Sequence, residues 1–436
     1  MRKVGAAIVL GIFILTSCQK EINDMPDTPV IYKMSPTSGG KGTIVTITGT
    51  GFSTDTSRIK IMVNDRILSI TACTDTSVSF LIPVFSPAPK DPLQVALFID
   101  GKQVGNISDF KYHYKTILVS VTNGLVGFED GPVETAKLEE ILSLTIDSSD
   151  NIYTTQWQMP RVRKIGANGM VSTMAGDGTW GYLDGNGTTA RLGSFDFCAS
   201  DDLGNIYVAE NNNTTGTQYL RKIDTQKNVT TFATFPQNEA PYGIKRGKSG
   251  TFYYHSTKRI GKITPDGQVT LLAYSVGPGR GDKDGVFGEA KFHLYGGIDV
   301  SEDETRIYVG DNSYSNDIGG KVKVFDLTTN TIITIAGNTS LSSGDGDALN
   351  AGFRLITCVM LDKQGGLYIA DGRNDAIKYL INGQVTTVVG KAGSGDLDGE
   401  LSLAKLDYPH GLAINSKGEI FISCVNNNKL KKITTE

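Results

Sequence analysis

The chain has 436 residues, too many for one ordinary hydrophobic core, so we expect two domains or one large repeat array. Glycine is abundant at 51 residues, hydrophobic residues make up 39% and the net charge is only −4, which indicates a turn-rich, all-β protein. Because the chain has no excess of positive charge and no basic stripe, we exclude nucleic acid as a partner.

The N-terminus follows the pattern of a secretory signal. Two basic residues precede an apolar run over residues 4–15, and small residues precede Cys18. The run is too short to be a stable membrane span. The tetrad "LTSC" resembles a bacterial lipoprotein signal, which implies cleavage before Cys18 and lipid on its thiol and amine. We expect a signal peptide in residues 1–18 and a flexible tether in 19–28, with an uncleaved or simply secreted form as the alternative.

The tether "QKEINDMPD" carries acidic residues and a lysine. It resembles the export tag that sends Bacteroidetes lipoproteins to the cell surface. The resemblance implies an outer-membrane protein that contacts the membrane through its lipid alone, and a cell-surface location.

Four further cysteines are Cys73, Cys198, Cys358 and Cys424. They are far apart, lie in apolar strands and show no C-x-x-C spacing of the kind that holds metals. Although an exported protein is free to form disulfides, we expect four buried free thiols.

The first domain is expected over residues 29–115. In "SPTSGGKGTIVTITGTGF", residues 35–52, a Pro-Gly turn cluster precedes an alternating apolar strand, which indicates a small antiparallel sandwich. This segment resembles the IPT/TIG family of immunoglobulin-like domains, and the resemblance implies a fold without a chemistry. The residues at that family's characteristic places are Pro36, Gly39, Gly42, Thr43, Gly49, Gly51 and Phe52.

The second half of the chain repeats a short strand with an aromatic anchor, as in "GNIYVAE" at residues 204–210. Six copies occur at spacings of 46–60 residues, which indicates a repeat architecture. The anchors are Tyr153, Tyr207, Tyr253, Tyr308, Tyr368 and Phe421.

Each copy lies among three other short strands, so we predict a six-bladed β-propeller of four-stranded blades over residues 116–436. The pattern resembles the NHL repeat family, although that family's Asp-x-x-Asn-x-Arg-Ile run is intact nowhere. The sixth copy stops after three strands, and "TILVSVTNG" from Thr116 precedes the first copy. We therefore expect this early strand to complete the last blade and to close the ring.

The connectors of the propeller differ in length by type. Those from a fourth strand to the next blade are long, and they emerge on the same face as the connectors between second and third strands, so this face holds the loop-borne candidates for binding. Its repeated "Asp-Gly … Ala-x-Leu/Phe" phrases lack the spacing of a calcium loop. We expect them to serve turns and blade packing.

Non-repeating residues on that face are the better candidates for a ligand site. They mix aromatic and polar groups, which suits a small or elongated polar ligand. Two tryptophans there are able to stack on sugar rings, with local loop packing as the alternative. The predicted ligand-binding residues are Trp157, Trp180, Tyr182, Asp196, Glu210, Tyr242, Tyr295, Arg373, Tyr408 and His410.

Three functions compete. The first is a noncatalytic envelope lipoprotein that binds a glycan, with the IPT/TIG domain as spacer and no cofactor or metal. The second is a scaffold for outer-membrane protein partners. The third is a propeller lyase or hydrolase that uses Asp196, Tyr242 and His410 at the channel mouth. The chain has only four histidines and no His-x-His or His-Glu-x-x-His spacing, which favours a noncatalytic role.

Overall fold

A computed structural model describes residues 28–40, 42–64, 66–82, 92–112, 116–156, 158–211, 215–236, 241–277, 281–312, 319–339 and 342–435. The described residues divide into two compact units, one up to residue 112 and one from residue 116. The predicted signal peptide, with Cys18, and nearly all of the tether lie outside the described residues.

The first unit has two β-sheets, as a sandwich requires. The first sheet has the order β1 (Val30–Ser35), β3 (Ile44–Thr50), β7 (Ser77–Leu81) and β6 (Ile70–Cys73). The second has the order β2 (Ser38–Gly39), β9 (Lys102–Tyr112), β8 (Leu93–Ile99), β4 (Ile59–Val63) and β5 (Arg66–Leu68), and a short helix η1 spans Thr56–Arg58.

Alternation along β3 explains how this unit forms a core. Val45 and Ile47 point inward and are at most 2% exposed, while Ile44 and Thr48 on either side are exposed. Gly49 follows on the same strand, and a Cβ there would lie 1.9 Å from the Val30 carbonyl oxygen and 2.5 Å from the Phe52 ring. Only glycine fits at that position of the strand.

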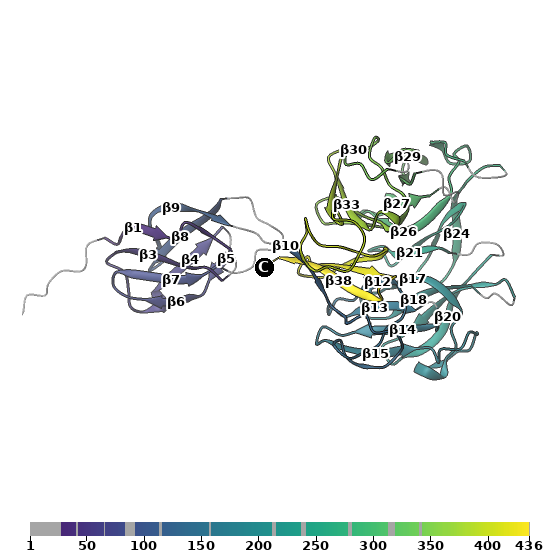
Figure 1. Ribbon diagram of the computed structural model, residues 1–436, viewed down its shortest axis with the longest axis horizontal. Helices are drawn as coiled ribbons and strands as arrows, with labels where there is room; N and C mark the ends of the chain where they lie inside the picture. Colours follow the sequence, from purple (N-terminus) through teal and green to yellow (C-terminus); the bar gives the residue numbers. More distant parts are fainter. Residues whose placement is uncertain are drawn as a thin grey trace, which may run out of the picture. The chain divides into compact units, whose positions relative to one another are not determined.

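The second unit is a ring of six sheets, which confirms the predicted propeller. The innermost strands contact one another in the order β12, β17, β21, β26, β31 and β36, and β36 contacts β12 again. Strands β10 and β38 in Figure 1 belong to the sheet where the ring closes.

The blades are numbered in chain order, and each has four main strands listed from the inside outward. Blade 1 has β12 (Ile141–Ile146), β13 (Ile152–Gln156), β14 (Arg161–Ile165) and β15 (Met170–Ala175). Blade 2 has β17 (Ser194–Ser200), β18 (Ile206–Asn211), β19 (Gln218–Ile223) and β20 (Asn228–Phe235). Blade 3 has β21 (Gly243–Arg246), β22 (Phe252–Ser256), β23 (Arg259–Ile263) and β24 (Val269–Tyr274).

The remaining blades repeat the arrangement. Blade 4 has β26 (Leu294–Val300), β27 (Arg306–Asp311), β28 (Lys321–Asp326) and β29 (Thr331–Ala336). Blade 5 has β31 (Ile356–Leu361), β32 (Leu367–Asp371), β33 (Ala376–Ile381) and β34 (Gln384–Val389). Blade 6 has β36 (Pro409–Ile414), β37 (Ile420–Cys424), β38 (Lys429–Thr435) and the early strand β10 (Thr116–Ser120).

The closure of the ring follows the prediction. Strand β10 pairs antiparallel with β38, with Leu118 opposite Ile433 and Ser120 opposite Lys431. Leu118 is fully buried in an apolar cluster of blades 5 and 6. The pairing removes two open edges of the sheet.

Five blades carry a strand that the sequence analysis did not predict. A two-residue segment, which begins with the glycine of each Asp-Gly phrase, pairs with the fourth strand of its blade. These segments are β11 (Gly131–Pro132), β16 (Gly185–Asn186), β25 (Gly285–Val286), β30 (Gly346–Asp347) and β35 (Gly399–Glu400). Two short helices, η2 (Gly187–Thr189) and η3 (Gly372–Asn374), also lie in connectors.

Apolar side chains fill the spaces between neighbouring blades. The cluster between blades 3 and 4, for example, joins Tyr253 and Ile260 to Ile298 and Val309. The alanine and Leu/Phe residues of all five Asp-Gly phrases are at most 3% exposed, which confirms their packing role. Cys198, Cys358 and Cys424 are buried free thiols as predicted, whereas the free thiol of Cys73 is only half-buried.

Candidate functional site

The candidate site lies where the innermost strands of the propeller begin. Connectors after fourth strands and those between second and third strands meet at this end of the antiparallel blades, and we call it the loop face. Tyr295, Tyr408 and His410 belong to innermost strands or directly precede them, and Tyr242 directly precedes β21. All four side chains are half-buried.

His410 has a fixed orientation at this position. Its Nδ1 lies 3.1 Å from the carbonyl oxygen of Leu142 in blade 1, so Nδ1 carries the proton and donates. Burial lowers the pKa of His410 to about 4, and the ring is therefore neutral at physiological pH. Within the described part of the chain nothing hydrogen-bonds to Nε2, which leaves that nitrogen as an acceptor.

Two aromatic rings lie near His410. The Phe197 ring centroid lies 6.0 Å from that of His410, and the Tyr408 ring stacks on His410 at 6.5 Å. Burial raises the pKa of Tyr408, and the positive charge of Arg373 opposes that rise. Arg373, on η3, is exposed. The structure thus places the predicted residues His410 and Tyr408 side by side, with Arg373 near enough to act on Tyr408 electrostatically.

A second aromatic pair lies in blades 3 and 4. Tyr242 and Tyr295 have ring centroids 5.9 Å apart. The Tyr242 amide donates to the carbonyl of His255 at 2.8 Å, which holds the start of β21 in place.

Trp180 is a further predicted binding residue in a connector of the propeller. This tryptophan is 46% exposed in the connector between blades 1 and 2. Trp157 lies outside the described residues, and the side chain of Asp196, in β17, does so too. The predicted pair of tryptophans is therefore represented by Trp180 alone.

Glu210 occupies an interior position instead of the loop surface. Its side chain is fully buried, and its Oε2 lies 3.2 Å from Nη1 of Arg221, which is also buried. Burial raises the pKa of Glu210 to about 8, and the nearby Arg221 opposes the rise. Glu210 has no open path to a ligand and serves the inside of blade 2.

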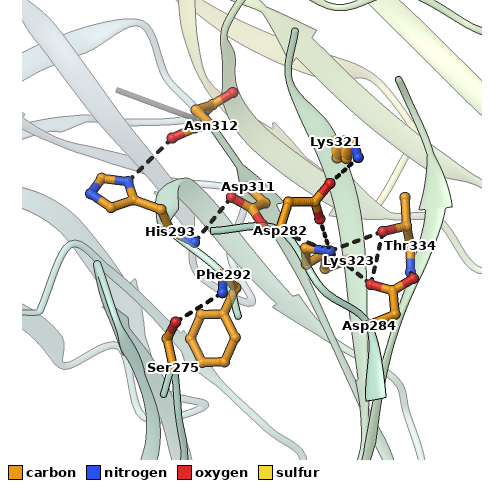
Figure 2. A network of polar contacts seen from close by, with 10 residues as sticks. All are labelled: Ser275, Asp282, Asp284, Phe292, His293, Asp311, Asn312, Lys321, Lys323 and Thr334. Carbon is orange, nitrogen blue, oxygen red and sulfur yellow. Dashed lines mark hydrogen bonds and ion pairs between the residues drawn. The ribbon is translucent and has the colours of Figure 1, made fainter. Parts of the chain in front are cut away.

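A repeated ionic contact, which we call the clasp, explains the Asp-Gly phrases. Each clasp joins the phrase's aspartate to a buried cation on the third strand. In blade 4, Lys323 Nζ lies 2.8 Å from Asp284 Oδ1 and 2.7 Å from Asp282 Oδ1 (Figure 2). The other pairs are Asp130–Arg163, Asp184–Arg221, Asp345–Lys378 and Asp398–Lys431.

Four clasps also include a hydroxyl residue on the fourth strand. Asp284, for example, accepts hydrogen bonds from the backbone N–H of Thr334 at 2.7 Å and from its hydroxyl at 3.0 Å. Burial alone would raise the pKa of Asp284, but the bonds from Lys323 and Thr334 hold it below its ordinary value. The equivalents of Thr334 are Thr173, Thr387 and Ser120.

In four of the five clasped blades, a second side-chain pair lies two residues before the aspartate and the cation of the clasp. The two side chains differ in type from blade to blade, but in each case they attract each other. Tyr182 packs on Tyr219 with ring centroids 4.9 Å apart, which gives Tyr182 a packing role in blade 2. The pairs in other blades are Phe128–Arg161, Asp282–Lys321 and Asp396–Lys429.

The described histidines of the propeller bond to backbone carbonyls. His255 Nε2 lies 2.6 Å from the Gly296 carbonyl oxygen of the next blade. His293 Nδ1 lies 3.2 Å from the carbonyl oxygen of Asn312 (Figure 2). No hydrogen bond between described side chains joins His410 to Tyr242. Over the same ranges no group of three His, Cys, Asp or Glu side chains is placed to hold a metal ion.

Polar residues of the clasps were missed by sequence reasoning, although a signal for them exists. The cations Arg163, Arg221, Lys323, Lys378 and Lys431 recur in the same five blades as the Asp-Gly phrases. The remaining blade, blade 3, has neither the Asp-Gly phrase nor the cation, so the two features vary together along the chain.

Two hollows lie away from the channel mouth. One of about 450 Å³ is bordered by the clasp of blade 4, including Asp282 and Thr334, and by Leu349. The other, of about 390 Å³, lies between short turns of blades 1 and 2 and is lined by Tyr153 and Lys227 among others. Neither is lined by a predicted ligand-binding residue.

No helix over the described ranges has the length and apolar character needed to cross a bilayer.

Comparison with known proteins agrees with this architecture. Residues 29–114 match the model of the IPT/TIG domain, and residues 406–433 match that of the NHL repeat. The NHL match falls in blade 6, while the other blades share its structure. The IPT/TIG match confirms the predicted identity of the first domain.

Relatives of known sequence or structure are distant. The Protein SUPPRESSOR OF QUENCHING 1, chloroplastic, of Arabidopsis thaliana is 26% identical over 359 residues, 79% of this chain, and the chain spans only 29% of that protein's length. A Bacteroides thetaiotaomicron protein of unknown function has 18% identity and a TM-score of 0.67, with 95% of this chain and 99% of the other covered. An auxiliary nutrient binding protein of Bacteroides ovatus has 17% identity and a TM-score of 0.62, with 94% and 98% covered. These likenesses show the fold.

Proposed function

We propose that this chain is a noncatalytic lipoprotein of the cell envelope that binds a glycan at the channel mouth of its propeller, with the IPT/TIG domain as spacer. The observation that carries the proposal is the group formed by His410, Tyr408 and Arg373. It presents an aromatic face, a neutral acceptor and a positive charge within one small region.

The chemistry of this group suits sugar hydroxyls. His410 Nδ1 is occupied by the Leu142 carbonyl, so Nε2 accepts a hydrogen bond from a ligand O–H. Tyr408 offers a ring to the apolar face of a sugar, and Arg373 donates to its oxygens. Trp180, 46% exposed on the same face, provides a further ring for an elongated glycan.

The envelope location rests on the sequence "LTSC" and its acidic tether. The structural likeness to an auxiliary nutrient binding protein of Bacteroides ovatus supports a ligand-binding role. We further propose that Cys18 carries the lipid and that the protein faces the cell surface. Replacement of Cys18 by alanine is expected to release the chain from the membrane fraction, and retention there would show that the lipid is not its only attachment.

A glycan array screened with the chain lacking residues 1–18 tests the ligand. The strongest glycan is then titrated against Tyr408→Ala and Trp180→Ala, and each is expected to weaken binding about ten-fold, or ~1.4 kcal/mol. Leu397→Ala serves as the control, because Leu397 is 49% exposed in another connector of the loop face and should leave binding unchanged.

The role of His410 is tested separately. Glutamine is able to donate to Leu142 and accept from a ligand, so His410→Gln should keep most of the affinity, whereas His410→Leu should lose it. Equal affinity for all variants, or no glycan bound at all, would reject the glycan site and favour a protein partner.

A further inference from the structure

Blade 3 differs from the other five at its outer edge. In the clasped blades, a two-residue segment covers the beginning of the fourth strand, as Gly185 does opposite Val229 in blade 2. The sheet of blade 3 ends at β24, and among the described residues no segment pairs with its outer side. The connector that leads into blade 3, residues 236–242, is much shorter than the connectors that carry the two-residue segments.

Every polar partner of the clasp is replaced in blade 3. Gly261 pairs with Leu271, just as Lys323 pairs with Thr334 in blade 4, so glycine stands at the place of the cation and leucine at that of the hydroxyl residue. A Cβ on Gly261 would lie 2.3 Å from the Tyr254 ring, so this buried ring fills the space where other blades hold their cation. The edge is thus rebuilt with apolar groups.

The exposed edge has the character of a pairing surface. Residues 268–277 carry no charge, and no clasp aspartate lies over them. Leu271 is 43% exposed and Tyr274 is 50% exposed on β24. Protein edges are normally protected by charges, proline or a covering segment, and an uncharged apolar edge is a template for another strand.

We propose that β24 is a docking edge for a second copy of this chain, which pairs with it antiparallel through its own β24. Two facts favour this occupant. The clasps show that the equivalent position in five blades accepts an antiparallel strand, and an uncharged strand brings no like charges together when it faces itself across a twofold axis. A single strand pair buries less surface than a standard interface, so we expect a weak dimer and test it at micromolar concentrations.

Cross-linking of the full chain tests the pairing. A short bismaleimide is added to Leu271→Cys at concentrations from about 1 to 100 μM, since tenfold steps resolve a micromolar Kd. We expect a band of twice the chain's mass on a denaturing gel that grows with concentration. The matched control is Ile333→Cys, because Ile333 is 48% exposed on β29, the fourth strand of clasped blade 4. It should give at most the background of the unmodified chain.

A second measurement removes the edge without a cross-link. Leu271→Lys places two like charges near each other across the axis and should leave a monomer in sedimentation velocity, whereas Ile333→Lys should dimerise like the unmodified chain. A chain that stays monomeric up to 100 μM, or a dimer that persists in Leu271→Lys, would overturn the proposal. Equal cross-linking of the two cysteine variants would do so as well.

Discussion

Buried ionisable residues at the ends of second strands are the most unusual single residues of the propeller. Glu210, Asp311 and Asp371 hold equivalent positions in blades 2, 4 and 5. Burial raises the pKa of Asp311 to about 7 and that of Asp371 to about 6, while the nearby Lys323 and the bond from Asn374, respectively, oppose the rise. Each carboxyl binds its proton more tightly in the folded chain than in the unfolded chain, so folding is favoured at mildly acidic pH.

Glu210 gives the clearest test of this effect. Its folded pKa of about 8 exceeds the ordinary 4.5, so its contribution to stability is fully present below pH 4.5 and is lost as the pH rises through 8. Glu210→Gln imitates the protonated acid. We expect it to gain about 3 kcal/mol relative to the unmodified chain between pH 5 and pH 8 in urea unfolding, because one pKa unit corresponds to about 1.4 kcal/mol. An identical loss of stability between pH 5 and pH 8 in both chains would show that Glu210 does not titrate in this range.

The clasps join the long connectors of the propeller to the third strands of five blades. Each binds a buried cation, 0–1% exposed, to an aspartate whose side chain is 31–58% exposed. A buried charge is costly without its partner, so the aspartate and the cation depend on each other. Blade 3 supports this view, because it lacks both.

Blade 5 provides the variant for the clasp. Asp345→Asn leaves Lys378 Nζ with the carbonyl groups of Ser343 and Gly344 and without its nearest counter-charge, and we expect a loss of about 2–3 kcal/mol. Removal of both charges in Asp345→Asn with Lys378→Met should be less harmful than the single change. Thermal unfolding of the single and double variants measures the difference, and additive losses would contradict the mutual dependence.

Ring closure governs the propeller as a whole molecule. The chain contributes β10 from before the first blade to the sheet of the last, so blade 6 exists only when both ends of the propeller meet. The innermost strands contact their neighbours all the way round the ring. Separation of the ring at one blade therefore weakens the packing of the blades beside it. The first unit has its own core and its own sheets.

Leu118 tests the closure. It is fully buried on β10, and Leu118→Ala should destabilise the propeller by about 2–5 kcal/mol. Calorimetry is expected to show two transitions, of which only the larger moves. Val45→Ala in the sandwich, equally buried, should move only the smaller. A shift of both transitions by either variant would show that the two units unfold together.

Much of the fold was predictable because it depends on local patterns. The aromatic anchors such as Tyr207 recur with the blade period, and the strand from Thr116 supplies what the last copy lacks. The Ala-x-Leu/Phe residues were expected to pack, and they are buried. These features follow from strand alternation and turn chemistry, which neighbouring residues determine.

The loop face was harder to predict, because a connector's length does not say where its side chains point. Glu210 lies at the end of a strand, where a surface residue would also be expected, yet its side chain is inside the blade beside Arg221. Tyr182 is matched by Tyr219, and His410 by the carbonyl of Leu142, from segments remote in sequence. By itself the sequence determined the repeat, the two domains' fold class and the ring closure, since each is written in local periodicity. Only the tertiary structure decided which polar residues face each other inside the blades and which, like Tyr408 and His410, meet at the channel, because burial and partner distance arise only when distant strands pack.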